Sequence, residues 1–473
     1  MSMYNIANTE EVIVLEDGQA PPTGTTIPPR KPKWYDTLSY IANPDQFCRQ
    51  NLEKYGPIFN TGVFGRTTIF VGSAKAIQMA FNGDLKYTEI ALPATTMDMF
   101  GEYSLFQRPD LHRQRKNALA PGLTGRVLDG YTPLINDVIW RGINSWTTPG
   151  TIAVHPAVEK ICFDILVPVL LGISLDDSAP ETFQGLPITS KAELKTLYQT
   201  YFDGFYGLSQ WKSPLTKYGR GLSARHKLLE FMRAVVTRRR GEGQVIKPTA
   251  DFLSMMLDSQ QENPDGVFSD ELIENQCLLQ LWASDYEVSG LISSLMYQIA
   301  RHPQVISRLR QEQASLIGEN SQVTMFSPEQ LKQMVYLEAT IKETLRTLPP
   351  SSTASRLLTK SVVLDGVLYK KGCVIIAEPR IAHIIPDYFH QPEVFAPERF
   401  LPERGEGKMY QFIPFGGGVH ACLGAQMAIA ITKVFASHLL QMFNWEATGD
   451  AQFVQFPLKK LKDNYQMKLT RRV

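Results

Sequence analysis

The stretch that decides the fold reads Phe415-Gly416-Gly417-Gly418-Val419-His420-Ala421-Cys422-Leu423-Gly424. It carries one cysteine between glycines, directly before an apolar pattern with helical spacing. Such a cysteine can hold its sulfur out of a tight loop beneath a helix N-terminus, where backbone N–H groups and the helix dipole favour the thiolate. A shielded thiolate suits an axial ligand of haem iron, because its electron density helps to cleave an O–O bond. The stretch therefore predicts that Cys422 is a metal ligand.

The composition is ordinary for a globular protein, with 473 residues of which 44% are hydrophobic and 20% are charged. The formal net charge of +1 excludes an overall field that would recruit nucleic acid or an anionic membrane, although local basic patches are compatible with it. The cysteines are odd in number and far apart, and none lies in a C-x-x-C pair, which favours a reducing compartment. They are Cys48, Cys162, Cys277, Cys373 and Cys422.

No segment has the roughly 18 uninterrupted apolar residues that a membrane-spanning helix needs. The longest apolar run near the N-terminus, Val12-Ile13-Val14-Leu15, is broken by Glu16 and Asp17, so no signal peptide or anchor is visible. We therefore expect a soluble, cytoplasmic protein. Residues 1–27 are expected to form a polar, flexible leader and residues 28–473 a single domain, because no linker or repeat interrupts them.

Helical patterns dominate the chain, with two β-rich patches between them. Residues 58–71 are expected to form a hairpin, and residues 362–376 a second set of strands. The longest helix is predicted over residues 270–302, which are apolar on most faces as in a central buried helix. Another helix begins at a capping box, Ser327-Pro328-Glu329-Gln330, and is expected to run unbroken towards the prolines at 349–350. The fold class is therefore mainly α with small β-sheets.

Four motifs, in this order and at these spacings, give the sequence its resemblance to a known family. They are His112-Arg113-Gln114-Arg115-Lys116, Glu343-x-x-Arg346, Pro397-Glu398-Arg399-Phe400 and Phe415-x-x-Gly418-x-His420-x-Cys422-x-Gly424. The sequence resembles the cytochrome P450 haem-thiolate family over nearly everything after Pro28. The resemblance implies the P450 fold, with a haem b cofactor between the long central helix and the Cys422 loop.

The resemblance also implies a role for each residue of the haem site. Cys422 becomes the proximal iron ligand and a catalytic residue. The other cofactor-binding positions shape the cysteine loop or hold the two haem propionates. They are His112, Lys116, Arg356, Phe415, Gly418, His420 and Gly424. Of these, the two histidines, Lys116 and Arg356 would supply the positive charge that the propionates need.

A second set of residues has other roles in the family. Glu343 and Arg346 share a helix face, and Arg399 would complete a Glu–Arg–Arg network that locks the segment supporting the cysteine loop. Arg113 and Arg115 are expected to face solvent. They would then belong to a basic docking surface for an electron donor, of the ferredoxin or flavin type.

The central helix departs from the family where the family carries Ala/Gly-Gly-x-Asp/Glu-Thr. The window here reads Ala283-Ser284-Asp285-Tyr286-Glu287-Val288, with Tyr286 at the acid position and Glu287 at the threonine position. In the family, this acid and this alcohol deliver protons during oxygen activation. Three interpretations stay open. Glu287 can relay protons, alone or together with Asp285, as a carboxylate of raised pKa. Alternatively the substrate supplies the proton, as in family members that couple aromatic rings, or no dioxygen is activated, as in members that rearrange hydroperoxides.

Aromatic and methionine side chains gather where the family places its substrate pocket. The lid segment, residues 197–218, contains Tyr198, Tyr201, Phe202, Phe205, Tyr206 and Trp211. A surface of this kind suits a flat, apolar guest, and a carboxylate can fix an N–H or O–H of that guest. The residues expected to bind substrate are Met97, Phe100, Trp282, Ala283, Tyr286 and Glu287.

The function expected from these features is oxidation of a hydrophobic, aromatic small molecule of specialised metabolism. Radical oxidative coupling, which forms a C–C, C–N or C–O bond or a ring, stands beside conventional hydroxylation or epoxidation with dioxygen and donated electrons. Rearrangement of a hydroperoxide and a non-enzymatic haem sensor are further alternatives. The sequence does not choose among them, because the substrate is not encoded in any motif.

Overall fold

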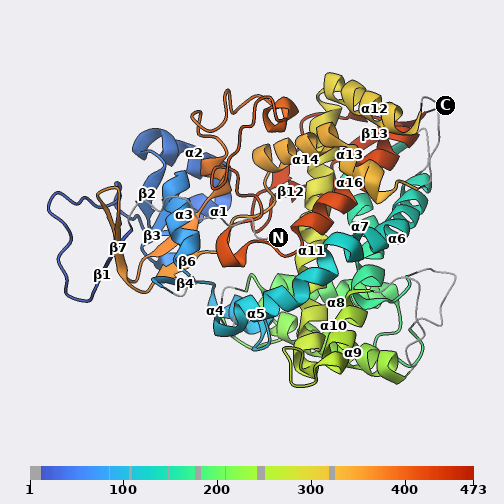
Figure 1. Cartoon of the computed structure of the whole chain (residues 1–473), viewed down its shortest axis with the longest axis horizontal. Helices are drawn as coiled ribbons and strands as arrows, with labels where there is room; N and C mark the ends of the chain where they lie inside the picture. The colour runs from blue at the N-terminus through green and yellow to red at the C-terminus, as the bar shows by residue number, and fades with distance from the viewer. Residues whose placement is uncertain are drawn as a thin grey trace. The chain divides into compact units, whose positions relative to one another are not determined.

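The computed structural model describes residues 12–84, 86–105, 109–146, 150–175, 183–207, 209–241, 251–318 and 325–472. These residues are mostly helical with small sheets, which confirms the predicted fold class (Figure 1). The chain divides into two compact units. Unit 1 comprises Met1–Leu92, Ser351–Val394 and Pro402–Cys422, and unit 2 comprises Pro93–Pro350, Phe395–Leu401 and Leu423–Val473. The single domain expected over residues 28–473 stays a prediction.

The main sheet of unit 1 has five strands in the order β2-β3-β9-β6-β4. Its strands are β2 (Ile58–Thr61), β3 (Thr68–Val71), β9 (Val374–Ala377), β6 (Arg356–Leu358) and β4 (Thr88–Ile90). β2 and β3 pair antiparallel, which confirms the predicted hairpin, whereas β3 and β9 are parallel. A parallel pair needs a long connection, and here the largest segment of unit 2, Pro93–Pro350, lies between the two strands in the sequence.

A second sheet of unit 1 has the order β1-β7-β8. It contains β1 (Ile13–Leu15), β7 (Ser361–Leu364) and β8 (Val367–Tyr369). Asp365 and Gly366 both adopt positive φ between β7 and β8, as a two-residue hairpin turn requires. Residues 1–11 of the expected leader lie outside the described residues. The rest of that leader differs from the expectation, because its β-branched run forms β1 and pairs with β7.

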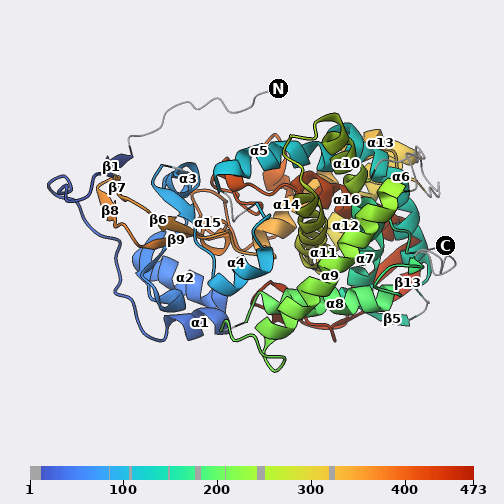
Figure 2. The ribbon, with the colours of Figure 1, turned by 90° about the horizontal axis from the view of Figure 1, so that it is seen from below.

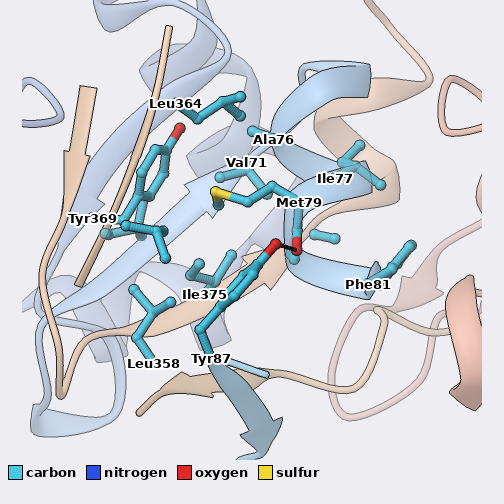
Figure 3. Packing of buried hydrophobic residues seen from close by; sticks show 14 of the residues in the cluster. Val71, Ala76, Ile77, Met79, Phe81, Tyr87, Leu358, Leu364, Tyr369 and Ile375 are labelled. Carbon is cyan, nitrogen blue, oxygen red and sulfur yellow. Dashed lines mark hydrogen bonds between the residues drawn. The ribbon is translucent and has the colours of Figure 1, made fainter. Parts of the chain in front are cut away.

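The core of unit 1 lies between these strands and α3 (Ala74–Asn82). Ser73 caps this helix by accepting a hydrogen bond from the backbone N–H of Ala76 at 3.4 Å. Figure 3 shows Val71, Ile77 and Ile375 packed together, with the Tyr87 hydroxyl donating to the carbonyl oxygen of Met79 at 3.2 Å. The remaining helices of unit 1 are α1 (Asp36–Ala42), α2 (Pro44–Tyr55), α15 (Pro379–Ala382), η1 (Val63–Gly65) and η5 (Gly418–His420).

Unit 2 contains the other helices and two smaller sheets. Its helices are α4 (Ala94–Phe100), α5 (Pro109–Leu119), η2 (Ala120–Leu123), α6 (Gly125–Asn144), α7 (Val154–Leu171), α8 (Lys191–Gly204), α9 (Lys217–Gly241), α10 (Phe252–Glu262), α11 (Asp270–Ala300), α12 (Pro303–Ile317), α13 (Pro328–Gln333), α14 (Val335–Thr347), η4 (Pro397–Phe400) and α16 (Ala425–Met442). Its strands are β5 (Gly150–Ala153), β10 (Phe443–Ala447) and β13 (Gln466–Arg471) in one sheet, and β11 (Phe453–Val454) and β12 (Lys460–Leu461) in the other.

α11 is the long central helix of unit 2, as the sequence predicts. Its 31 residues extend over about 46 Å. Ser269 caps it by accepting a hydrogen bond from the N–H of Leu272 at 3.2 Å, and Pro303 begins the next helix. α7, α9, α14 and α16 pack against it (Figure 2). Because helices surround α11, apolar residues occupy most of its faces.

The capping box at Ser327 is present, but the single helix predicted after it is wrong. The chain forms α13 and α14 instead, with Met334 between them in a non-helical conformation. Glu312 of α12 accepts hydrogen bonds from the backbone N–H groups of Tyr336 and Leu337, the latter at 2.9 Å. A carboxylate from another helix therefore satisfies the free N–H groups at the new helix start and stabilises the break.

Within the ranges that the structure describes, no helix is both long enough and apolar enough to cross a lipid bilayer.

Candidate functional site

The cysteine loop of unit 1 depends on glycines that pack against α3. Gly416 and Gly418 adopt φ angles of 67° and 66°, which side chains disfavour. A Cβ atom on Gly418 would lie 2.4 Å from the backbone oxygen of Phe81, so only glycine fits there. The N–H of Cys422 donates to the carbonyl oxygen of Phe415 at 2.9 Å and closes the loop. The sequence between Phe415 and Cys422 therefore fixes one tight backbone path.

Cys422 differs from the other cysteines in its exposure. It is exposed, whereas Cys48, Cys162 and Cys277 are buried and Cys373 is half-buried. Burial raises the pKa of each of these four other thiols, which keeps them protonated and unsuited to bind a metal. Cys422 is thus the cysteine whose position suits a thiolate ligand.

An arginine and a histidine side chain of unit 1 converge on Asp84, which follows α3. Arg356 is buried at the start of β6, and its Nε donates to Asp84 Oδ1 at 2.9 Å. The same guanidinium donates from Nη1 to the carbonyl oxygen of Ala354 at 2.7 Å and lies 5.6 Å from the centre of the Phe81 ring. His420 of the cysteine loop places Nε2 at 3.8 Å from Asp84 Oδ2. Asp84 thus ties a strand, a helix end and the cysteine loop together.

These residues of unit 1 fit a haem group by their chemistry. An exposed thiol supplies the soft ligand that iron binds, and the glycines beside it permit the tight backbone path of the loop. A buried guanidinium on β6 and an imidazole in the loop supply donors for carboxylate groups. The donor set is therefore the one that an anionic porphyrin requires.

Glu343 lies at the centre of a buried network in unit 2. Arg346 binds its carboxylate in a bidentate manner, with Nε to Oε2 at 2.7 Å and Nη2 to Oε1 at 2.8 Å. Arg399 donates from Nε to Oε1 at 3.0 Å, and the N–H of Ala396 donates to the same oxygen at 2.9 Å. All three ionic side chains are buried, so their charges depend on one another. The network holds η4 against α14.

α5 carries the early basic motif and differs in part from the expectation. His112 is buried, and its Nδ1 lies 3.2 Å from the carbonyl oxygen of Leu105. A carbonyl only accepts, so the hydrogen is on Nδ1, and His112 donates through Nε2 only when it is an imidazolium. Lys116, one helical turn further, is half-buried and Arg113 is exposed. Arg115 does not face solvent as predicted: it is buried and donates to the carbonyl oxygen of Ser104 at 2.8 Å.

Trp282 and Tyr286 of α11 stack on two phenylalanines, Phe202 of α8 and Phe205, which follows α8. We call these four rings the aromatic wall. The rings of Trp282 and Phe205 are stacked at 4.3 Å between centres, and those of Tyr286 and Phe202 at 3.9 Å. Phe100 of α4 meets Trp282 edge-on at 5.2 Å. The indole N–H of Trp282 is buried and has no acceptor among the described residues. The structure thus joins three of the predicted substrate-binding residues into one aromatic surface (Figure 2 shows α4, α8 and α11).

The other predicted substrate-binding residues lie apart from this wall. Ala283 is exposed on α11, next to Trp282 in the sequence. Met97 of α4 lines a separate open groove of about 400 Å³ with Tyr218 and Leu222 of α9. Trp211 of the expected lid is exposed and is not part of the aromatic surface. A helix presents neighbouring residues to different sides, which is why Ala283 and Trp282 separate although they are adjacent in the sequence.

Asp285 is buried on the side of α11 that faces charged residues of α7, α8 and β12. Burial is the main cause that raises its pKa to about 8. The Glu159 carboxylate contributes to this rise, while Lys195 and Lys460 oppose it. Its Oδ1 has no hydrogen-bond partner among the described residues. Lys195 lies 3.6 Å from Glu159, and Lys460 lies 5.9 Å from the ring centre of Tyr286. The carboxyl group of Asp285 is therefore mostly protonated at neutral pH, and it is buried in unit 2.

Glu287 lies in a different environment from Asp285. Glu287 is half-buried. The pKa of Tyr206 is raised mainly by the burial of that tyrosine, and the negative charge of Glu287 is the second cause. Two residues on a helix are separated by about 200°, so Asp285 and Glu287 point to different sides of α11. The structure therefore does not bring the two carboxylates together, and a proton relay through Glu287 stays a prediction. Glu287 lies near Tyr206, whereas Asp285 faces Glu159.

Comparison with known proteins defines the class to which this fold and these residues belong. The sequence profile of the cytochrome P450 family matches residues 27–469, and the chain belongs to this family. Its members are haem-thiolate oxidoreductases, so the protein is an enzyme of the monooxygenase type that uses haem, a redox partner and a hydrophobic substrate.

Three individual relatives illustrate the similarity. Putative cytochrome P450 120 of Synechocystis sp. is 28% identical over 92% of this chain and 94% of its own length. Cytochrome P450 26B1 of Danio rerio is 30% identical over 85% of this chain and 78% of its own length. The solved structure of retinoic acid bound cyanobacterial CYP120A1 has a TM-score of 0.81 and 26% identity, and the match covers 95% of this chain and all of that one.

Several residues of the cysteine loop's surroundings and of the Asp285 environment belong to no recognisable sequence motif. Asp84 and Phe81 brace the cysteine loop, and Glu159, Lys195 and Lys460 surround Asp285. Each lies far along the chain from its partner, and nothing in its own segment marks the contact. The sequence signal for Phe202 and Phe205 was the aromatic density of residues 197–218, although it did not specify their stacking partners.

Proposed function

We propose that this protein is a haem b monooxygenase that inserts oxygen into a C–H or C=C bond of a hydrophobic, conjugated small molecule. The observation that carries the proposal is the stacked wall of Trp282, Phe205, Phe202 and Tyr286, whose flat apolar faces suit a planar guest. The retinoic acid of the similar CYP120A1 structure is a guest of this kind. The electrons would come from a ferredoxin- or flavin-type partner.

We assign the haem-binding roles to the residues that fit them by geometry. Cys422 is the proximal ligand, on the loop that Phe415, Gly418 and Gly424 shape. His112, Lys116, Arg356 and His420 hold the propionates. When bound, haem supplies the oxygen activation that no side chain can provide. Arg356 is the strongest of the propionate candidates, because its burial and its partners Asp84 and Ala354 fix the guanidinium before any ligand arrives.

We assign proton handling and substrate orientation to Glu287 and not to Asp285. Glu287 is half-buried near a tyrosine hydroxyl group, so its carboxylate can accept a proton or hold a polar group of the guest. The indole N–H of Trp282 adds a donor for an acceptor oxygen of the guest. Phe100 closes the edge of the wall.

Radical oxidative coupling is the second candidate, because α11 carries Tyr286 and Glu287 where the family has its acid and its alcohol. A coupling reaction removes hydrogen atoms from the substrate and inserts no oxygen, so it depends less on that pair. The stacked face of Tyr286 on Phe202 also suits an aromatic guest held against the wall.

Turnover under isotopically labelled dioxygen distinguishes these reactions. The reconstituted protein is first titrated with retinoic acid and with aromatic candidates, and a low-to-high spin shift of the iron identifies a guest. Label in the product of that guest supports monooxygenation, whereas an oxidised, coupled product without label supports coupling and contradicts our proposal. Isomerisation of a hydroperoxide without reductant would indicate rearrangement. Absence of any spin shift would favour a haem sensor over an enzyme of this kind.

A further inference from the structure

A groove runs between α6 and α7 of unit 2. These two helices lie side by side (Figure 1), and together with Lys191 at the start of α8 they line a cavity of about 540 Å³. We call this cavity the α6–α7 groove. Its volume is within the range of ~300–1,000 Å³ that small-molecule pockets occupy. None of the described residues that line it belongs to α11 or to the aromatic wall, so the groove is distinct from the expected substrate pocket.

The α6–α7 groove has an apolar lining. Leu134, Val138 and Trp146 are spaced at multiples of four residues on one face of α6, and all three are half-buried. Gly142 belongs to the same face, and a Cβ atom on it would lie 2.6 Å from Ile161 Cγ1 of α7. The two helix backbones therefore approach each other closely at Gly142, while the larger side chains of that face line the groove.

The charged residues that line the α6–α7 groove have a positive sum. Three cations stand against two acids, which leaves +1; these residues are Arg141, Lys160, Lys191, Asp164 and Asp251. Lys191 forms an ion pair with Asp164. Arg239 donates from Nη1 to Asp251 Oδ2 at 2.7 Å. Both acids are therefore neutralised by the protein itself, and the excess charge of the groove is a cation.

Lys160 is the cation of the groove that remains available to a ligand. It is exposed on α7 and has no hydrogen bond or ion pair within the part of the chain that the structure describes. The acid whose charge acts on it is Asp164, which Lys191 already binds. Arg141 is also exposed, and its Nη2 donates to Asp137 Oδ2 at 2.6 Å. An exposed pair of this kind contributes little to stability, so the guanidinium group can bind a ligand as well.

We propose that the α6–α7 groove binds a small amphipathic carboxylate, with its anionic group at Lys160 and its apolar body along the α6 face. The apolar lining favours an alkyl or ring system, and α6 rises by roughly 18 Å between Leu134 and Trp146, which gives an extended chain room to lie. The excess cation favours an anion over a neutral or cationic amphiphile. Because the groove is distinct from the aromatic wall, the proposal is independent of the reaction that the enzyme catalyses.

The test is calorimetric titration of the full-length haem-loaded protein with dodecanoate below its micelle concentration, while the absorption spectrum follows the iron spin state. We expect dodecanoate to bind at a site that causes no spin shift and that high salt weakens. Val138→Trp, which fills the groove, should remove this binding. Lys160→Glu should weaken it roughly tenfold, because the anion then meets a like charge. The matched control is Lys227→Glu, an exposed lysine of α9 outside the groove, and it should bind as the wild type does.

Three outcomes would overturn the proposal. The first is that dodecanoate does not bind, or binds only with a spin shift, because it would then occupy the haem pocket alone. The second is that Val138→Trp or Lys160→Glu binds as tightly as the wild type. The third is that dodecyltrimethylammonium binds as tightly as dodecanoate, because the cation would then play no part. Far-ultraviolet circular dichroism establishes that each variant is folded, and if Val138→Trp is not, the exposed Lys160→Glu change carries the test.

Discussion

Replacing Asp285 with asparagine should remove a pH-dependent loss of stability from the protein. Asparagine has the same shape as the protonated carboxyl group and cannot ionise. In the native protein burial raises the pKa of Asp285 from 3.8 to about 8, with Glu159 as the next cause. In the unfolded chain the same carboxyl group titrates near its ordinary value. The native state therefore binds one more proton than the unfolded state between these two pH values.

The sign and size of the effect follow from this difference. Below the unfolded pKa both states hold the proton, and Asp285 does not affect the pH dependence. As pH rises from about 4 to about 8, unfolding releases the proton, so the free energy of unfolding falls by about 1.4 kcal/mol per pH unit. At about pH 7 the accumulated loss is on the order of 4 kcal/mol, and above the native pKa it stays constant. Asp285→Asn should lack this contribution entirely.

Urea denaturation of the wild type and of Asp285→Asn, followed by circular dichroism, measures the effect. The difference in unfolding free energy between variant and wild type should increase by several kcal/mol between about pH 4.5 and about pH 7.5. Asp203→Asn is the matched control, because Asp203 is an exposed aspartate of α8 whose ion pair with Lys217 spans 3.7 Å at the surface. A difference for Asp285→Asn that is the same at both pH values would refute the assignment of a protonated, buried carboxyl group.

Glu343→Gln should lower the free energy of unfolding by about 3–5 kcal/mol, because it leaves two buried guanidinium groups without their anion, and a loss below about 1 kcal/mol in urea denaturation would contradict this. Gly418→Ala should reduce haem retained per protein in the absorption spectrum, since its Cβ would lie 2.4 Å from the Phe81 oxygen. Gly130→Ala is the control, because Gly130 is exposed on α6 and no heavy atom lies within 4 Å of its Cβ position, and equal retention in both variants would count against the packing argument. Trp282→Ala should weaken binding of whichever guest gives the spin shift in the wild type, roughly tenfold; unchanged affinity would remove the aromatic wall from the pocket.

Features encoded in short stretches could be predicted from the sequence. The caps at Ser269 and Ser327, the glycines of the cysteine loop and the hairpin over residues 58–71 all form as the residue types require. Glu343 and Arg346 are also local, because three residues separate neighbours on a helix face. In each case one segment contains both the group and its partner.

Features that depend on distant segments could not be predicted in this way. Glu312, which lies on α12, stabilises the break in the helix after Ser327. Asp84 forms an ion pair with Arg356, which is 272 positions away in the sequence. The environment of Asp285 likewise comes from α7, α8 and β12. The sequence shows that Asp285 and Glu287 are two residues apart on one helix. Only the packing of α11 decides which of the two carboxylates is buried beside charged neighbours.

The carbon monoxide complex of the reduced protein tests most directly whether the Cys422 sulfur binds the iron. We predict that the wild type absorbs near the wavelength from which the P450 family takes its name, and that Cys422→Ser loses this band while far-ultraviolet circular dichroism shows a folded chain. A Cys422→Ser protein that keeps the band would contradict the assignment, and so would a wild type that gives no coloured complex after reconstitution with haem.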